Sequence, residues 1–462
     1  MPRNRTIYNT EAIFIGPAPS TGYHFINDVG TLSNTGSSNL IKNIGRVQSA
    51  SYGITVSYNN IVELGKRGIV SQPIINAPTV NLGFDFLHRG VINELRLGLL
   101  CNYQNDQGAS AAPFYSNNFG ISLISGLVTR ELIQPTSFPY WPLSYRDKRN
   151  IFIVVAPEGE DVNKTTYYES DPANRNFAVY SFGDCYLNSY TARASVGALP
   201  SCSVSYICEN LEVLASGTGV SIPAINPQTY SGYTGVKFNI PTSFDGGVDP
   251  VSALLPGDIN LSFTSYPPIT GVLAIQGTGY ARSANAAVTD LGASFTDFKV
   301  QDYEISMGLG REALYSMGYK APVDRVITFP VIANLSTSAV IGDSQTGALW
   351  QLSNKNNDYD VTISLRNPAY ADIQGVGLRY DFKRAKLNSF NYSSTIGSNK
   401  IGVFNWSVEL DPDDLSKGMF ISGLLNVDFS RDILLTKNDN SRFLLNAGGG
   451  YILSRYLTQI TY

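Results

Sequence analysis

The chain has 462 residues, of which 43% are hydrophobic and only 15% charged, with a net charge of −4. No basic tract occurs, which argues against sequence-reading of nucleic acid through clustered Lys and Arg. The polarity comes instead from Ser, Thr, Asn, Gly and Tyr, a mixture that favours β-structure with many turns and surfaces that pack against other subunits.

The N-terminal stretch MPRNRTIYNTEAIFIG has no long apolar segment with a cleavage site after it, so we expect no signal peptide. No apolar run reaches the roughly 18 residues of a membrane-spanning helix. We therefore expect no membrane association. The four cysteines lack a CxxC spacing, which argues against a zinc site. We expect them to be free buried thiols, although Cys202 and Cys208 could pair in oxidising conditions.

Residues 47–80 and 300–331 carry one order of features twice. Each copy begins with Val-Gln, enters an aromatic strand, reaches a glycine, continues with a basic residue and ends near a proline. The marking residues are Tyr52, Gly65 and Pro78 in the first copy and Tyr303, Gly318 and Pro330 in the second. Because an internal repeat determines how a chain is divided, this order predicts a duplicated domain.

A short helix is expected inside each copy. The segment REALYSMG (311–318) has strong helix formers and a terminal glycine suited to a left-handed cap. Its counterpart NNIVELG (59–65) offers Asn60 as an N-cap. The glycines of GLGRE (308–312) are expected to ease the turn from strand to helix rather than to bind phosphate.

A second repeat lies further along the chain, where LNSYTARASVG (187–197) recurs as LNSFNYSSTIG (387–397). The identical positions are Leu187, Asn188, Ser189 and Gly197 in one copy and Leu387, Asn388, Ser389 and Gly397 in the other. Each glycine is expected in the turn of a hairpin. Together the repeats predict a mainly-β chain of two tandem domains, 1–210 and 291–462, joined by a loop-rich insertion or linker, 211–290.

Candidate catalytic residues are few. Only His24 and His88 are present, and we expect His88 at the surface or at a strand end. The acidic run ELDPDDLSKG (409–418) is interpreted as a solvated helix start, with calcium binding as the alternative. A pair of carboxylates for glycan cleavage also stays an alternative, because their separation is spatial. We expect no enzyme, no cofactor and no metal.

The repeated block closing on Pro-Val and followed by LNSY…SVG resembles the tail tube (major tail) proteins of long-tailed bacteriophages, in a duplicated two-domain form. The resemblance covers about 47–87, 149–210, 300–341 and 357–410. It implies two tandem β-sandwich domains, each with a short helix, that contribute strands to a shared inner β-barrel.

The same resemblance implies a structural virion protein. Homotrimeric, pseudo-hexameric rings would stack into a tail tube, contact other tail proteins and let DNA pass without specific binding. Assembly would occur in the host cytoplasm, and the product would lie in the virion tail. The alternative within this class is another ring-forming component, such as a neck, terminator or baseplate protein.

Overall fold

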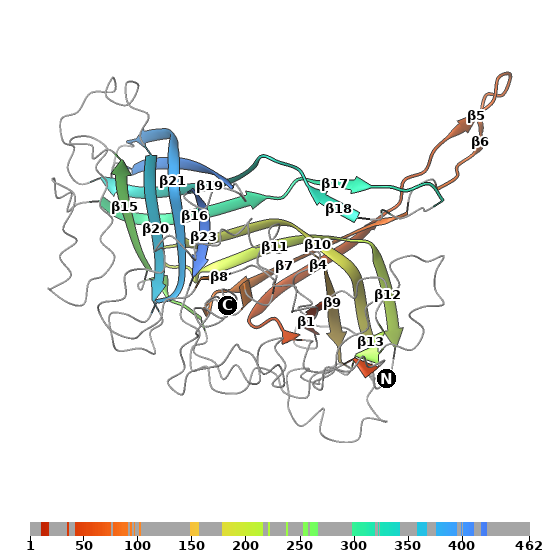
Figure 1. The fold of residues 1–462 in the computed structure, drawn as a ribbon, viewed down its shortest axis with the longest axis horizontal. Helices are drawn as coiled ribbons and strands as arrows, with labels where there is room; N and C mark the ends of the chain where they lie inside the picture. The colour runs from red at the N-terminus through yellow and green to blue at the C-terminus, as the bar shows by residue number, and fades with distance from the viewer. Residues whose placement is uncertain are drawn as a thin grey trace, which may run out of the picture.

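The computed structural model of the chain consists almost entirely of strands (Figure 1). The predicted mainly-β fold class is confirmed. The residues that the structure describes are 11–17, 35–36, 42–74, 77–90, 93–94, 97, 101–102, 148–156, 178–215, 220–221, 237–238, 253–256, 259–266, 298–318, 322, 324–341, 358–366, 376–394, 399, 401–410 and 417–422.

Two sets of strands with the same connectivity make up most of the fold, and we call them unit 1 and unit 2. Unit 1 contains β1 (Glu11–Pro17), β4 (Val47–Thr55), β7 (Thr79–Leu87), β9 (Lys148–Val155), β10 (Ala178–Ser195), β11 (Ser201–Cys208) and β12 (Asn210–Ala215). Unit 2 contains β15 (Ile259–Tyr266), β16 (Phe298–Gly308), β19 (Val331–Ile341), β20 (Asp358–Arg366), β21 (Val376–Ser393), β22 (Ile401–Leu410) and β23 (Gly418–Ser422).

Two hairpins project from these units, and short strands complete the fold. The hairpins are β5 (Ile61–Val62) with β6 (Ile69–Ser71), and β17 (Arg311–Leu314) with β18 (Asp324–Ile327). The remaining strands are β2 (Thr35–Gly36), β3 (Lys42–Asn43), β8 (Cys101–Asn102), β13 (Val220–Ser221) and β14 (Lys237–Phe238).

The strands of the two units pair in the same way. In unit 1, β10 pairs with β9, β11 and β12, β11 with β7, β7 with β4, and β9 with β1. In unit 2, β21 pairs with β20, β22 and β23, β22 with β19, β19 with β16, and β20 with β15. All of these pairings are antiparallel, so the fold is a structural duplication.

The duplication holds at the level of register. The partners of β10 in β11 recur 200 positions later in β21 and β22, including the irregularity after Leu187 and Leu387. The partners of β4 in β7 recur 253 positions later in β16 and β19, including the irregularity after Val47 and Val300. Because a bulge inserts one residue and changes the side-chain alternation beyond it, bulges at matching places fix the equivalence of the two units residue by residue.

The longest strands, β10 and β21, each belong to two sheets. Their N-terminal halves pair with β9 and β20, and their C-terminal halves continue along β11 and β22. Asp184 (φ 47°) and Arg384 (φ 55°) lie at equivalent places in the left-handed region, which non-glycine residues adopt uncommonly. Pairing is interrupted beside both, which lets one strand bend from one sheet into the next.

One continuous hydrophobic cluster runs through both units. Alternate residues of β7 and β22 are buried, as expected for strands with one face toward the core. The largest fully buried side chains include Trp406, Tyr186 and Phe182. Of the four cysteines, Cys185, Cys202 and Cys208 are buried free thiols, as predicted.

The predicted short helices are wrong. Residues 311–318 form β17 and the turn after it, and residues 59–65 contain β5 and an equivalent turn. Gly65 (φ 87°) and Gly318 (φ 88°) are therefore turn residues and not helix caps. Cross-strand pairing outweighs the helix propensity of the REAL segment, because propensity contributes only tenths of a kilocalorie per residue.

The predicted insertion, 211–290, contains strands that pair with each of the two units. β12 extends into this interval and pairs with β10. β15 lies wholly inside it and pairs with β20 of unit 2. The interval thus supplies a strand to each unit, and the boundaries 1–210 and 291–462 remain a prediction about where each folding unit begins and ends.

Candidate assembly interface

The two units join edge to edge within the chain. β16 of unit 2 pairs antiparallel with the C-terminal half of β10, from Ser189↔Gly308 to Ser195↔Asp302. The large sheet therefore runs β21-β22-β19-β16-β10-β11-β7-β4, with unit 2 followed by unit 1 (Figure 1). The junction is a closed part of the core, since the side chains of Ile305 and Met307 are 0% and 1% exposed.

The β17–β18 hairpin lies against unit 1 beside this junction. We call residues 311–327 arm 2. Arg311 Nε donates to the carbonyl oxygen of Leu187 at 2.7 Å, and the guanidinium lies 5.3 Å from the ring centroid of Tyr186. The Tyr186 hydroxyl donates to Asp324 at 3.0 Å, and Arg325 forms an ion pair with Glu209. Arm 2 is thus fixed on unit 1 by polar contacts.

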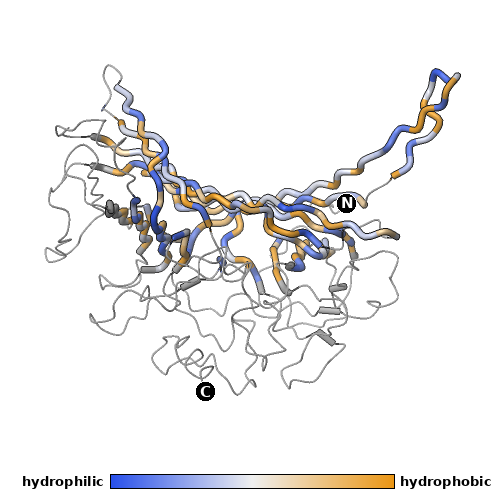
Figure 2. Tube along the Cα trace, turned by 45° about the horizontal axis from the view of Figure 1, so that its top comes forward, coloured by the Kyte–Doolittle hydropathy of each residue, from blue (hydrophilic) through white to orange (hydrophobic). Residues whose placement is uncertain are grey.

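Arm 1, residues 58–74, is the counterpart of arm 2 and lies against no described strand of the body. Its bridge Tyr58↔Ile74 corresponds to Arg311↔Ile327, 253 positions later. Figure 1 shows it extending away from the sheets, and Figure 2 shows hydrophobic residues along it. The exposed apolar side chains of arm 1 are Tyr58, Ile61, Val62, Leu64, Ile69, Val70 and Ile74. Such a contiguous apolar exposure is typical of an interaction surface.

The strand edges equivalent to those of β16 and β10 have no pairing partner among the described strands. Among the described strands, β4, the counterpart of β16, pairs only with β7, and residues 389–393 of β21 pair only with β22. Tyr52 and Ile54 of β4 are 46% and 55% exposed. Their equivalents at the closed junction, Ile305 and Met307, are 0% and 1% exposed. Tyr392 of β21 is 40% exposed, whereas its equivalent is the buried Ala192. Apolar side chains therefore line both open edges.

Small polar side chains cover the other face of the large sheet. Figure 2 shows this sheet as a concave arc, with the second sheet of each unit on its convex side. Rows of directly opposite residues on the polar face include Thr191, Ser203, Asp85 and Ser49 in unit 1, and Glu304, Ser336, Asn405 and Ser389 in unit 2. The concave face is thus hydrophilic without being strongly cationic.

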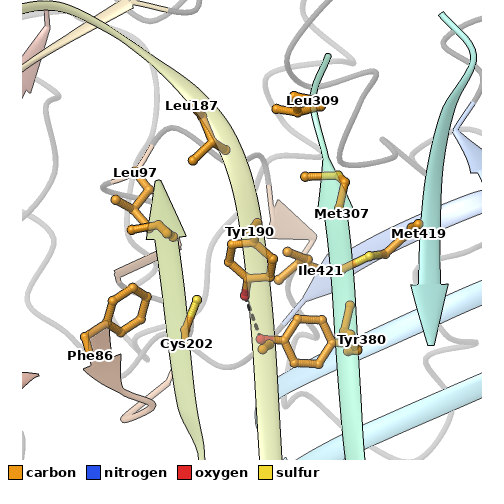
Figure 3. Packing of buried hydrophobic residues seen from close by; sticks show 14 of the residues in the cluster. Phe86, Leu97, Leu187, Tyr190, Cys202, Met307, Leu309, Tyr380, Met419 and Ile421 are labelled. Carbon is orange, nitrogen blue, oxygen red and sulfur yellow. Dashed lines mark hydrogen bonds between the residues drawn. The ribbon is translucent and has the colours of Figure 1, made fainter. Parts of the chain in front are cut away.

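A buried polar cluster holds the two units together behind the junction. His88 and Glu94 are fully buried, and their Nδ1 and Oε1 atoms lie 3.1 Å apart. Tyr190 of unit 1 and Tyr380 of unit 2 share a hydrogen bond of 2.7 Å between their hydroxyls (Figure 3). His88 directly follows β7, at a strand end as predicted. Its side chain is buried, so the alternative prediction of a surface position is wrong.

Burial, more than any neighbouring charge, raises the pKa of Tyr190 and of Tyr380 well above the usual value near 10. Well below pH 10 the folded and the unfolded chain both keep these hydroxyls protonated, so the stabilisation is complete. Above it the unfolded chain ionises first, so stability falls as the pH rises. We expect the urea midpoint to fall between about pH 9 and pH 11, and to fall less in the Tyr190→Phe, Tyr380→Phe double variant.

The exposed Tyr58→Phe variant is the control for this pH experiment, since its side chain is 60% exposed. It should follow the wild-type profile. An equally steep alkaline decline in the double variant would contradict the assignment to the buried pair.

The signature residues around the two LNS segments lie at the bulges of β10 and β21. The Ser189 hydroxyl contacts the Ser205 hydroxyl at 2.6 Å, and Asn405 Nδ2 donates to the Ser389 hydroxyl at 3.0 Å. Leu187, Asn188, Leu387 and Asn388 occupy the same irregularities. Gly197 (φ 85°) is in the β10–β11 turn, and Gly397 lies outside the described residues.

The other signature residues are not all equivalent. Gly65 and Gly318 occupy matching turns. Tyr52, however, is equivalent to Ile305, because Tyr52 lies opposite Leu82 as Ile305 lies opposite Leu335. Tyr303 corresponds to Ala50. Pro78 and Pro330 both precede a strand, yet they differ by one position in the alignment. The spacing from valine to proline, 31 residues in the first copy and 30 in the second, reflects this shift.

Other candidate groups give no further site. The described part of the chain contains no helix with the length and apolar character of a membrane span, and no described group of three or more His, Cys, Asp or Glu could hold a metal ion. The run Asp411, Asp413 and Asp414, proposed for capping or calcium, and His24 lie outside the described residues.

No family model matches the chain, and no curated protein sequence matches it. Among solved structures, it is similar to a chain in the "Cryo-EM structure of the anti-feeding prophage (AFP) baseplate, 6-fold symmetrised", with 12% sequence identity and a TM-score of 0.23. The match covers 37% of this chain and 95% of that chain. A likeness this low decides neither the family nor the function.

Proposed function

We propose that this protein is a non-catalytic structural subunit that assembles head to tail with copies of itself. One observation carries the proposal. Within the chain the β16 edge is covered by β10, while no described strand covers the equivalent edges of β4 and of residues 389–393 in β21. An open strand edge is a template for pairing with another chain. The open edges of β4 and β21 are equivalent to the edges of β16 and β10, which pair with each other within the chain. We therefore propose that each open edge pairs with the other open edge of a second copy of the chain.

Such a contact is heterologous, since different edges meet, and it closes into a ring when its rotation divides a full turn. The concave arc of the large sheet supports closure (Figure 2). We propose a homotrimer in which six units form a pseudo-hexameric ring and their large sheets line an inner β-barrel. This stoichiometry rests on the resemblance to duplicated tail tube proteins.

We further propose that the rings stack into the tail tube of a phage virion. Leu64 and Met317, at the turns of the two arms, are 103% and 100% exposed, although arm 2 is already fixed on unit 1. These turns are the surfaces left for contact with the next ring or with other tail proteins. The polar concave face would line the lumen and let DNA pass without specific binding, after assembly in the host cytoplasm.

Negative-stain electron microscopy with solution mass tests this proposal. Hollow tubes, or pseudo-sixfold rings of three chains, are the expected result. Rings that never stack would favour a neck, terminator or baseplate component instead. A monomer at all concentrations would contradict assembly.

Charge placed at both arm turns should separate stacking from ring formation. We expect Leu64→Asp with Met317→Asp to form rings but to shorten tubes at least about tenfold, because burial of each apolar side chain is worth roughly 1.5–3 kcal/mol. Val213→Asp is the control, since Val213 is 52% exposed and lies on β12 and not at either arm turn. Tube lengths are counted by electron microscopy, and unchanged lengths in the double variant would contradict stacking through the arms.

A further inference from the structure

The closed junction serves as a template for the contact between chains. Residues of β16 pair with β10 in a defined register, and both strands have residue-by-residue counterparts in β4 and β21. We infer that β4 of one chain pairs antiparallel with residues 389–393 of the next chain, with Ser51 opposite Ser393, Tyr52 opposite Tyr392 and Ile54 opposite Phe390. This inference rests on the proposed function and adds the partner strand and its register.

The residues on the two open edges complement one another in this register. Tyr52 and Tyr392 would form an aromatic cross-strand pair where the closed junction has Ile305 opposite Ala192. Aromatic and β-branched pairs stabilise antiparallel sheets. On the polar face, the charged pair Arg193↔Glu304 of the closed junction becomes a neutral pair of serines. The pairs at the closed junction and those proposed between chains are both complementary, but they consist of different types of residue.

Arm 1 would then lie on unit 2 of the neighbouring chain as arm 2 lies on unit 1. At the closed junction the Arg311 guanidinium lies over the Tyr186 ring. The equivalent positions hold Tyr58 and Lys386, so the aromatic ring and the cation exchange sides. A cation over an aromatic face is attracted whichever partner supplies the cation. The exchange keeps the interaction while changing both residues.

One further pair is expected between chains from this position of arm 1, and another is observed within each unit. Glu209, which pairs with Arg325, corresponds to Glu409, which would meet Gln72 of arm 1. Within each unit, Ser49 donates to Asp85, and the equivalent pair has Ser338 donating to Asp302, again with the two residue types exchanged. The observed Ser–Asp contact is thus retained across the duplication although its two residues are exchanged. This supports transfer of the closed-junction geometry to the contact between chains.

Disulfide trapping tests the register directly. Ser51 and Ser393 are exposed and lie at opposite ends of the large sheet, on edges that no other described strand covers, so a bond between introduced cysteines must join two chains. We expect Ser51→Cys with Ser393→Cys to give covalent oligomers up to the ring on oxidation. Opposite residues in a β-ladder are within disulfide reach, whereas residues four positions away are about 13 Å distant.

The out-of-register control is Ser51→Cys with Ser389→Cys, which should remain uncrosslinked, as should each single variant. Wild-type rings with no crosslink in the matched pair, or with a crosslink only in the control pair, would overturn the register and leave the proposed function standing. Absence of rings from the wild type would overturn the proposed function itself.

An exchange of partners tests the position of arm 1. Tyr58→Arg places a cation beside Lys386, so we expect the concentration needed for assembly to rise about tenfold. Adding Lys386→Tyr recreates the arginine–tyrosine pair of the closed junction and should restore assembly to within about threefold of wild type. Additive losses in the double variant would overturn this position of arm 1.

Discussion

We expect Ile54→Lys to abolish ring formation while leaving a folded monomer. Ile54 is 55% exposed in the isolated chain, so a lysine there costs the monomer little. Its equivalent in the closed junction, Met307, is 1% exposed, so the same position in a ring would bury an unpaired ammonium. Burial of an unpaired charge costs several kcal/mol, so the assembly concentration should rise at least about 100-fold.

Val213→Lys is the matched control for this variant, because Val213 is a β-branched residue of similar exposure on β12. Sedimentation velocity over a concentration series measures both variants. We expect Val213→Lys to assemble as wild type does. Normal rings from Ile54→Lys would show that β4 is not at the contact between chains.

A second large effect is expected from Glu209→Ala. The side chains of Glu209 and Arg325 are only 4% and 10% exposed, so removal of the carboxylate leaves a nearly buried guanidinium without its anion. Breaking a buried ion pair in this way typically costs about 3–5 kcal/mol. We expect a loss of that size in the free energy of unfolding, measured by urea denaturation of the dilute monomer.

Glu409→Ala is the internal control, because Glu409 is the counterpart of Glu209 in unit 2. Its carboxylate is 53% exposed and pairs with Lys417 at 3.0 Å, so its removal should change monomer stability by less than about 1 kcal/mol. Equal losses in the two variants would contradict the different environments of the two positions.

The sequence predicted the class of fold and the presence of a duplication, because both depend on local patterns. Alternating strands gave the mainly-β class, and the two LNS segments with Gly65 and Gly318 marked equivalent bulges and turns. The equivalence of β1 with β15 and of β12 with β23 was not predicted, since EAIFIGP and INLSFTSY share little beyond apolar character. Their equivalence depends only on which strands they pair with.

The arms show where local propensity misleads. REALYSMG begins with four helix formers, yet Arg311 reaches the Leu187 carbonyl from an extended strand. A glycine between two apolar segments, as in IVELGKRGIV, was the available signal for a hairpin. The candidate interface could not be predicted from sequence, because an edge is open or closed only in relation to the order of all strands in the sheet.

A cryo-EM map of the purified assembly at strand resolution tests the central claim most directly. The account predicts a continuous sheet around the ring in which β4 of each chain lies beside β21 of the next, with alternating junctions of the same geometry within and between chains. A ring in which β4 faces solvent, or pairs with β4 of another chain about a two-fold axis, would contradict it.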